Sequence, residues 1–176
     1  MGKGKGRKKT AANATRLPGK RVGESRSEMV EVVLPNDANP LGAMLGGKVM
    51  HLMDIAGALA AHRHSNSYVV TAAVDYVDFR SPVQIGDLIV LKSCVNRVFN
   101  TSMEVGVQVF VENYLTNERR QTSSAYLTFV AVDAQKRPIQ VPPLIPETAD
   151  ERRRFREAAI RRKLRLAQRH GHISKM

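Results

Sequence analysis

Residues 39–64 read NPLGAMLGGKVMHLMDIAGALAAHRH. The middle of this segment is apolar around the whole helical circumference, which is typical of a buried helix, because a surface helix keeps a polar face. The apolar positions are Val49, Met50, Leu52, Met53, Ile55, Ala56, Ala58, Leu59, Ala60 and Ala61. About 18 helical residues would span about 27 Å, but an ionised Asp54 at the centre would be costly in lipid. The pattern therefore predicts a core helix rather than a membrane span.

Asp54 is the acid within this helix, seven residues beyond Gly47 and too deep to act as a cap. Burying a carboxylate without partners costs several kcal/mol or raises its pKa. One interpretation is structural: the carboxylate pairs with a backbone amide or with an arginine from a neighbouring strand. The other is chemical. The Gly46-Gly47 pair opens the helix, whose free amides attract negative charge, so Asp54 could activate water beside an oxyanion site.

The charge of the chain is concentrated at its two ends. The 176 residues suit one domain, and a hydrophobic content of 43% allows a substantial core. The formal net charge of +12 divides into +7 for residues 1–28, −1 for residues 29–146 and +6 for residues 147–176. A nucleic-acid reader would carry its charge on the folded face that docks. Nucleic acid is therefore not expected as a partner of the core, and only the tails leave that contact open.

Cysteine usage and the absence of targeting patterns favour the cytoplasm. The single Cys94 excludes an intrachain disulfide framework and is expected to be a core thiol. No signal-peptide core follows Met1, and no uncharged run of about 18 residues occurs, so no membrane span is expected.

The periodicity divides the chain into three parts. Residues 1–27 form a Gly/Lys/Arg-rich segment that is expected to be a disordered basic tail, and residues 28–146 form the domain. Strands are predicted at Glu28–Leu34, Tyr68–Phe79, Leu88–Val98, 103–111 and Ser124–Asp133. Strands at hairpin spacing indicate an antiparallel sheet, so one long helix with about five strands predicts an α+β fold in which the sheet curls round the helix.

Residues 147–176 are predicted to form a basic C-terminal helix and tail. The helix is expected over residues 147–170, with Thr148 or Asp150 as its N-cap and Gly171 as its stop. A narrow apolar stripe would pack on the sheet or on a partner subunit; it consists of Phe155, Ala159, Ile160, Leu164 and Ala167. The remaining cationic surface either contacts acidic partners or draws in a polyanionic substrate.

Four blocks now carry a resemblance, and they read in order NPLGAMLGGKVMHLMDIAGALAA, VVTAAVDYVDFRSPVQIGD, NTSMEVGVQVFVE and YLTFVAVD. Together they resemble the acyl-CoA hydrolase branch of the hotdog-fold thioesterases over residues 28–142. The resemblance implies a hotdog subunit, in which an antiparallel sheet wraps a central helix. It also implies a dimer whose two sheets join edge to edge, with active sites at the dimer interface and commonly three dimers in a hexamer; a tetramer remains the alternative.

The resemblance further implies hydrolysis of acyl-CoA to free coenzyme A and a carboxylic acid, with no cofactor besides the coenzyme A of the substrate. Asp54 matches the family's helical acid and would act as general base, with a nucleophilic role as the alternative. Asn39, fifteen residues earlier, matches the loop asparagine and would orient the water or the carbonyl, from the opposite subunit in one version. Backbone amides near Gly46 and Gly47 would hold the oxyanion.

The coenzyme A handle needs a phosphate site. Thr101 and Ser102 match a family block near the nucleotide arm, although Asn100 stands where the family often has glycine. Arg97 either meets a phosphate or is a solvated charge at a strand end. Thr71 and Asp75 are expected to face the site or the dimer seam, two alternatives that the sequence does not separate. The histidines offer no ligand constellation, so no metal is expected.

A second function is a non-catalytic acyl-CoA sensor, because hotdog folds also serve in that role, and basic tails contacting nucleic acid would suit it. The Asn39 and Asp54 pair argues against a sensor, since binding alone does not require a water-activating acid. The preferred acyl chain length cannot be inferred from these residues.

Overall fold

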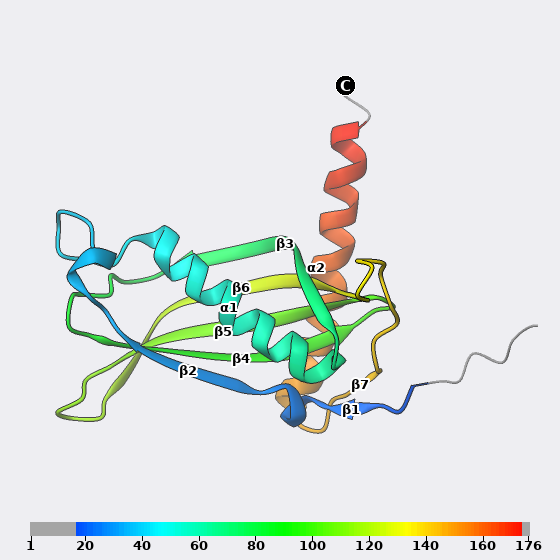
Figure 1. Ribbon diagram of the computed structural model, residues 1–176, viewed down its shortest axis with the longest axis horizontal. Coiled ribbons are helices and arrows are strands. Elements are labelled where there is room, and N and C mark those ends of the chain that lie inside the picture. Colours follow the sequence, from blue (N-terminus) through cyan, green and yellow to red (C-terminus); the bar gives the residue numbers. More distant parts are fainter. Residues whose placement is uncertain (1–16, 174–176) are drawn as a thin grey trace, which may run out of the picture.

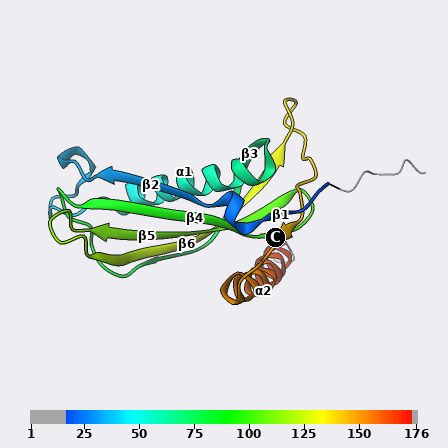
Figure 2. The same cartoon turned by 90° about the horizontal axis from the view of Figure 1, so that it is seen from below.

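The computed structural model describes residues 17–173. Five antiparallel strands form one sheet in the order β2-β4-β5-β6-β3: β2 (Ser27–Val32), β3 (Tyr68–Phe79), β4 (Leu88–Val98), β5 (Ser102–Glu112) and β6 (Arg119–Val132). Helix α1 (Gly46–Ser65) lies along one face of the sheet and α2 (Ala149–Ile173) crosses the other (Figures 1 and 2). The predicted α+β architecture is confirmed. Among residues 17–173, no helix has the length and apolar content needed to cross a bilayer.

The element bounds follow the sequence pattern most closely in the middle of the chain. Strands β3 and β4 have their predicted bounds, whereas β6 begins five residues before the predicted Ser124. The tail prediction differs from the structure over residues 20–27. There, β1 (Lys20–Arg21) pairs in parallel with β7 (Leu144–Ile145), and the short helix η1 (Val22–Ser25) buries Val22 in the core. A second short helix, η2 (Pro35–Asp37), follows β2. Residues 1–16 of the predicted tail lie outside the described residues.

Helix α1 packs closely on the sheet along one side. An added Cβ at Gly57 would lie 2.9 Å from the ring of Phe129, so the glycine lets the helix approach β6. The opposite flank stays open in the protomer, since Met50, Ile55 and Leu59 are 46%, 37% and 41% exposed. The expectation that this helix is buried all round therefore holds on the sheet side alone within one protomer.

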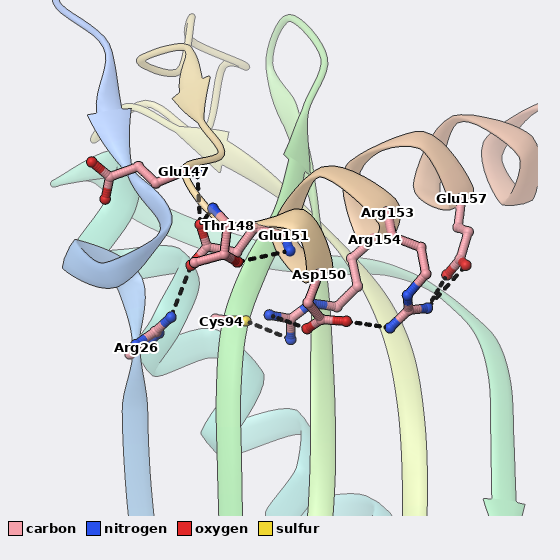
Figure 3. A network of polar contacts seen from close by, with 9 residues as sticks. All are labelled: Arg26, Cys94, Glu147, Thr148, Asp150, Glu151, Arg153, Arg154 and Glu157. Atoms are coloured by element: carbon pink, nitrogen blue, oxygen red, sulfur yellow. Dashed lines mark hydrogen bonds and ion pairs between the residues drawn. The ribbon is translucent and has the colours of Figure 1, made fainter.

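The N-terminus of α2 is fixed by a buried acid (Figure 3). Glu151 is 4% exposed and accepts hydrogen bonds from the backbone amides of Glu147 and Thr148, at 2.8 and 3.1 Å. In return, the Glu151 amide donates to the Thr148 hydroxyl at 3.1 Å, which makes Thr148 the cap of a reciprocal capping box. Arg26, beside β2, donates to the same carboxylate at 2.8 Å. Burial alone would raise the pKa of Glu151, but these donors together hold it below its usual range.

The rest of α2 docks through charged side chains rather than through its predicted apolar stripe. Arg161 makes two hydrogen bonds, of 3.1 and 2.7 Å, to Glu104 of β5, whose side chain is 1% exposed. Ile160 and Leu164 are 60% and 59% exposed, so these stripe residues do not pack on the sheet. The sheet surface beneath α2 is itself polar, which is why arginine fits it better than leucine. The predicted stop at Gly171 is also wrong: the helix continues to Ile173, because an interior glycine costs a helix only about 1 kcal/mol.

Replacing Glu151 by glutamine tests this anchor. Because the folded-state pKa is lowered, the stabilisation is complete above the unfolded-state value of about 4.5 and is lost as the pH falls through the folded value. We expect wild type to unfold at higher urea concentration than Glu151→Gln at pH 7, with the difference shrinking below about pH 4.5. Glu157→Gln, which alters an exposed ion pair of the same helix, is the control. A difference that persists undiminished at pH 3 would contradict the assignment.

Candidate active site

The Asp54 carboxylate meets a strand hydroxyl at the helix–sheet boundary. Asp54 is half-buried in the middle of α1, and its Oδ1 accepts a hydrogen bond of 2.6 Å from the Thr71 hydroxyl of β3. Thr71 lies opposite Phe129 in the register with β6, on the face that carries α1. Within residues 17–173 the Asp54 carboxylate has no ion-pair partner, so the predicted pairing with a strand arginine is not what holds it. The carboxylate remains available for chemistry.

A pocket of about 270 Å³ opens beside this pair. Apart from Asp54 and Thr71, its lining is apolar and comprises Met50, Met53, Val74, Val77, Ala125 and Leu127. The lining comes from α1, β3 and β6, so it forms only when the helix lies on the sheet edge. One carboxylate and one hydroxyl in an otherwise apolar cavity suit a ligand that has an apolar chain and a single reactive polar group. The sequence predicted the two polar residues but not which apolar ones would join them.

Asn39 lies in the loop before α1 and shapes that loop. Its side-chain oxygen accepts hydrogen bonds from the amides of Leu41 and Ala43, at 2.9 and 3.2 Å, while its own amide donates to the Ala43 carbonyl at 2.8 Å. Gly42 takes a φ of +77° within the turn, a conformation that favours glycine. Among residues 17–173, no hydrogen bond joins Asn39 to Asp54. The side-chain amide nitrogen of Asn39 also has no partner within this range.

Gly46 and Gly47 are the first two residues of α1, where backbone amides have no carbonyl of the helix to bond. Both are exposed. A Cβ added at Gly47 would meet nothing within 4 Å, and one at Gly46 would meet the Phe79 ring at 3.8 Å. The approach to these amides is therefore open in the protomer.

The predicted coenzyme A residues lie elsewhere. Thr101 and Ser102 are in the turn between β4 and β5, at the opposite end of the sheet from the Asn39 loop (Figure 1). Arg97 is held by α2: its guanidinium donates to the Phe155 carbonyl at 2.9 Å and lies 4.0 Å from the centre of the Phe155 ring. The structure brings Thr71 to Asp54 but none of these three residues. A phosphate role for them remains a prediction.

A larger hollow of about 890 Å³ lies between α2 and the outer face of the sheet, away from Asp54. Its cations already have carboxylate partners: Arg26 pairs with Glu151, Lys92 with Glu28, and both Arg153 and Arg154 with Asp150. Cys94 lies beneath α2 with Arg154 at 3.6 Å, and burial raises the pKa of its thiol. A paired, polar hollow with a protonated thiol offers no reactive group of its own.

The histidines do not form a metal centre in the described part of the chain. No group of three or more His, Cys, Asp or Glu side chains in residues 17–173 could hold an ion. His64 is fully buried, and its Nε2 bonds the Pro142 carbonyl at 2.9 Å. Burial lowers the pKa of His64, which keeps the ring neutral and structural.

Comparison with known proteins agrees with this geometry. A family model described as the thioesterase superfamily matches residues 41–116. The chain is 39% identical over 128 residues to a Bacillus subtilis protein named uncharacterized acyl-CoA thioester hydrolase YkhA, a match that covers 73% of this chain and 74% of that protein. The chain belongs to the thioesterase superfamily. It is also 40% identical over 146 residues, 81% of its length, to mouse acyl-coenzyme A thioesterase 11, but spans only 24% of that protein.

Solved structures of this superfamily share the whole fold. A Staphylococcus aureus acyl-CoA hydrolase, solved with butyryl coenzyme A and coenzyme A, superposes with a TM-score of 0.84 at 34% identity, covering 90% of this chain and 96% of that one. An apo-hexameric acyl-CoA thioesterase superposes with a TM-score of 0.83 at 41% identity, covering 86% and 97%. The hotdog fold is thereby confirmed.

Three variants of the Staphylococcus aureus hydrolase bear on the site. In them, alanine replaces an aspartate, an asparagine 15 residues before it, or a threonine 17 residues after it. In the present chain, Asn39 precedes Asp54 by the same interval and Thr71 follows it by the same interval.

Proposed function

We propose that this chain is an acyl-CoA thioester hydrolase in which Asp54 acts as general base. The hydrogen bond from Thr71 to Asp54 at the mouth of an apolar pocket is the observation that carries the proposal. The pocket would take the start of the acyl chain, and the carboxylate would meet the thioester carbonyl at its rim. The relatives named acyl-CoA hydrolases and the matching intervals among Asn39, Asp54 and Thr71 support this assignment.

The reaction needs one water and no other reactant. Asp54 takes a proton from water as the water oxygen attacks the thioester carbonyl, which forms a tetrahedral oxyanion. When the intermediate collapses, the carbon–sulfur bond breaks and the thiolate takes the proton back from the Asp54 carboxyl group. The products are a carboxylic acid and free coenzyme A. Thr71 fixes one carboxylate oxygen through its hydroxyl and leaves the other to face the water.

The open amides of Gly46 and Gly47 suit the oxyanion. Seven helical residues separate Gly47 from Asp54, which is about 10 Å along the axis. Helical side chains lean toward the N-terminus, so Asp54 points back along this distance. The attacking water and the carbonyl would lie in the remaining gap. Removing one such donor in other enzymes costs about 3–4 kcal/mol of transition-state stabilisation.

A second copy would complete the site. Strand β3 is the edge of the sheet and pairs only with β6, so its outer backbone groups have no strand partner within the described chain. Val70, Val74 and Tyr76 of this strand are 50%, 54% and 56% exposed. An exposed edge with large apolar side chains invites another strand. We propose that β3 pairs with β3 of a partner subunit across a two-fold axis, as the hexameric relatives encourage.

This pairing explains the scattered site residues. An antiparallel β3–β3 seam reverses the partner, so the Asn39 end of one subunit lies toward the Ser102 end of the other. Asn39 of the partner subunit could then orient the water or carbonyl at Asp54. The same arrangement places Thr101 and Ser102 where a coenzyme A tail would leave the seam. The exposed flank of α1 would be covered as well.

Replacing Asp54 by asparagine tests the chemistry. The amide cannot take a proton, so we expect the rate of free-thiol release from short and long acyl-CoAs to fall by about 10²–10⁴. Thr71→Val, which removes the hydroxyl but keeps the shape, should lower the rate by about tenfold to a hundredfold. Thr71→Ser should retain most activity.

The control is Asp78→Asn on the same strand, since Asp78 pairs with Arg80 outside the pocket. It should leave the rate close to wild type. Full activity in Asp54→Asn would exclude the general-base role. Tight acyl-CoA binding by wild type without thiol release from any chain length would favour the sensor function instead.

Charging the open flank of α1 tests the seam. Leu59→Glu places a carboxylate on a surface that is 41% exposed in the protomer, so an isolated subunit should tolerate it. If a second copy covers this flank, an unpaired buried charge should split the oligomer, which light scattering on a sizing column would detect. Leu115→Glu, in a turn at 79% exposure, is the matched control and should keep the native mass. The native mass in both variants would refute the proposed seam.

A further inference from the structure

The strand that carries Thr71 is irregular at two points. Its register with β6 shifts between Thr71 and Ala73 and again between Val74 and Tyr76, which leaves Ala72 and Asp75 as extra residues. In a regular strand, alternate residues share a face. Here the residues that line the pocket are instead Thr71, Val74 and Val77, at intervals of three. The bulges therefore create the pocket wall.

Asp75 points to the other face of the sheet because of these bulges. Its carboxylate is 9% exposed and forms an ion pair with Arg165 of α2, whose side chain is 16% exposed. These partners are 90 residues apart in the chain. A charge pair that is so far removed from solvent is costly to break, because either partner alone would be left buried and uncompensated.

Helix α2 is a firm base for this contact. One turn before Arg165, Arg161 binds Glu104 of β5 and stacks 3.7 Å from the centre of the Tyr126 ring of β6. The helix is thus fastened to the two central strands before it reaches the edge strand. The edge strand has a sheet neighbour on one side only, so its bulged segment depends most on contacts from outside the sheet.

We propose that Arg165 is a positioning residue for the active site: by holding Asp75 on the outer face, it selects the bulged register of β3. A strand that relaxed to regular alternation would turn Val74 out of the pocket and change the direction of Thr71 toward Asp54. The pair thereby couples the C-terminal helix to the reacting carboxylate without touching the substrate. The catalytic part of this inference rests on the proposed hydrolase function.

The test compares Arg165→Gln, Asp75→Asn and their double variant with wild type in the full-length chain. We expect kcat for acyl-CoA hydrolysis to fall about tenfold in each single variant, since small displacements of a reacting group are costly, while KM changes less than about twofold. The double variant should be no worse than the singles, because both remove one interaction. The exchanged pair Asp75→Arg/Arg165→Asp should recover part of kcat.

Hydrogen exchange of the peptides covering β3 provides a readout that does not depend on turnover. It should accelerate in the same variants and stay at the wild-type rate in β4. Arg153→Gln is the control, because Arg153 forms exposed ion pairs on the same helix. If either kcat or β3 exchange in Arg165→Gln matches that control, the proposal is overturned. A wild-type chain that hydrolyses no acyl-CoA would refute the hydrolase function, while the exchange data alone would still decide whether the pair holds β3.

Discussion

The hydrogen bond between Thr71 and Asp54 is the contact on which the site depends, because it ties the central helix to the edge of the sheet. A carboxylate on an apolar helix has few polar neighbours, and here its protein partner is a neutral hydroxyl rather than a cation. A cation would hold the carboxylate in a closed ion pair and reduce its basicity. A hydroxyl fixes its direction and leaves its charge available. The close approach of α1 to Phe129 at Gly57 sets the distance across which this bond forms.

The protomer is an incomplete body around that bond. The exposed flank of α1 and the free edge of β3 lie on either side of the pocket, and both carry large apolar side chains. Asn39 and the turn at Ser102 are at opposite ends of the same subunit (Figure 1). A two-fold partner would resolve these features together, since it would cover the apolar surface and bring the two ends into one site. The outer face has a different role, because α2 braces there the strand whose inner face carries Thr71.

Periodicity was sufficient to predict the elements near the site but not their facing. The alternating and apolar runs gave β3, β4 and α1 nearly to the residue, and the single acid in α1 identified Asp54. Thr71 and Asp75 are four residues apart and would share a face in a regular strand, yet the two bulges send them to opposite faces. Bulges depend on long-range contacts, here with an arginine 90 residues away, so no local pattern could reveal them. For the same reason, the apolar stripe of α2 was a poor guide, because the sheet surface that receives this helix is polar.

Complementation between two inactive variants tests most directly whether the site is shared by two subunits. Asn39→Ala and Asp54→Asn chains would be unfolded together, refolded as a mixture and assayed for thiol release. In a mixed dimer, one of the two sites would receive Asp54 from one chain and Asn39 from the other. Random pairing should then restore about one quarter of the wild-type activity per site. Recovery near that level would support the shared site, whereas a mixture as inactive as its two components would contradict it.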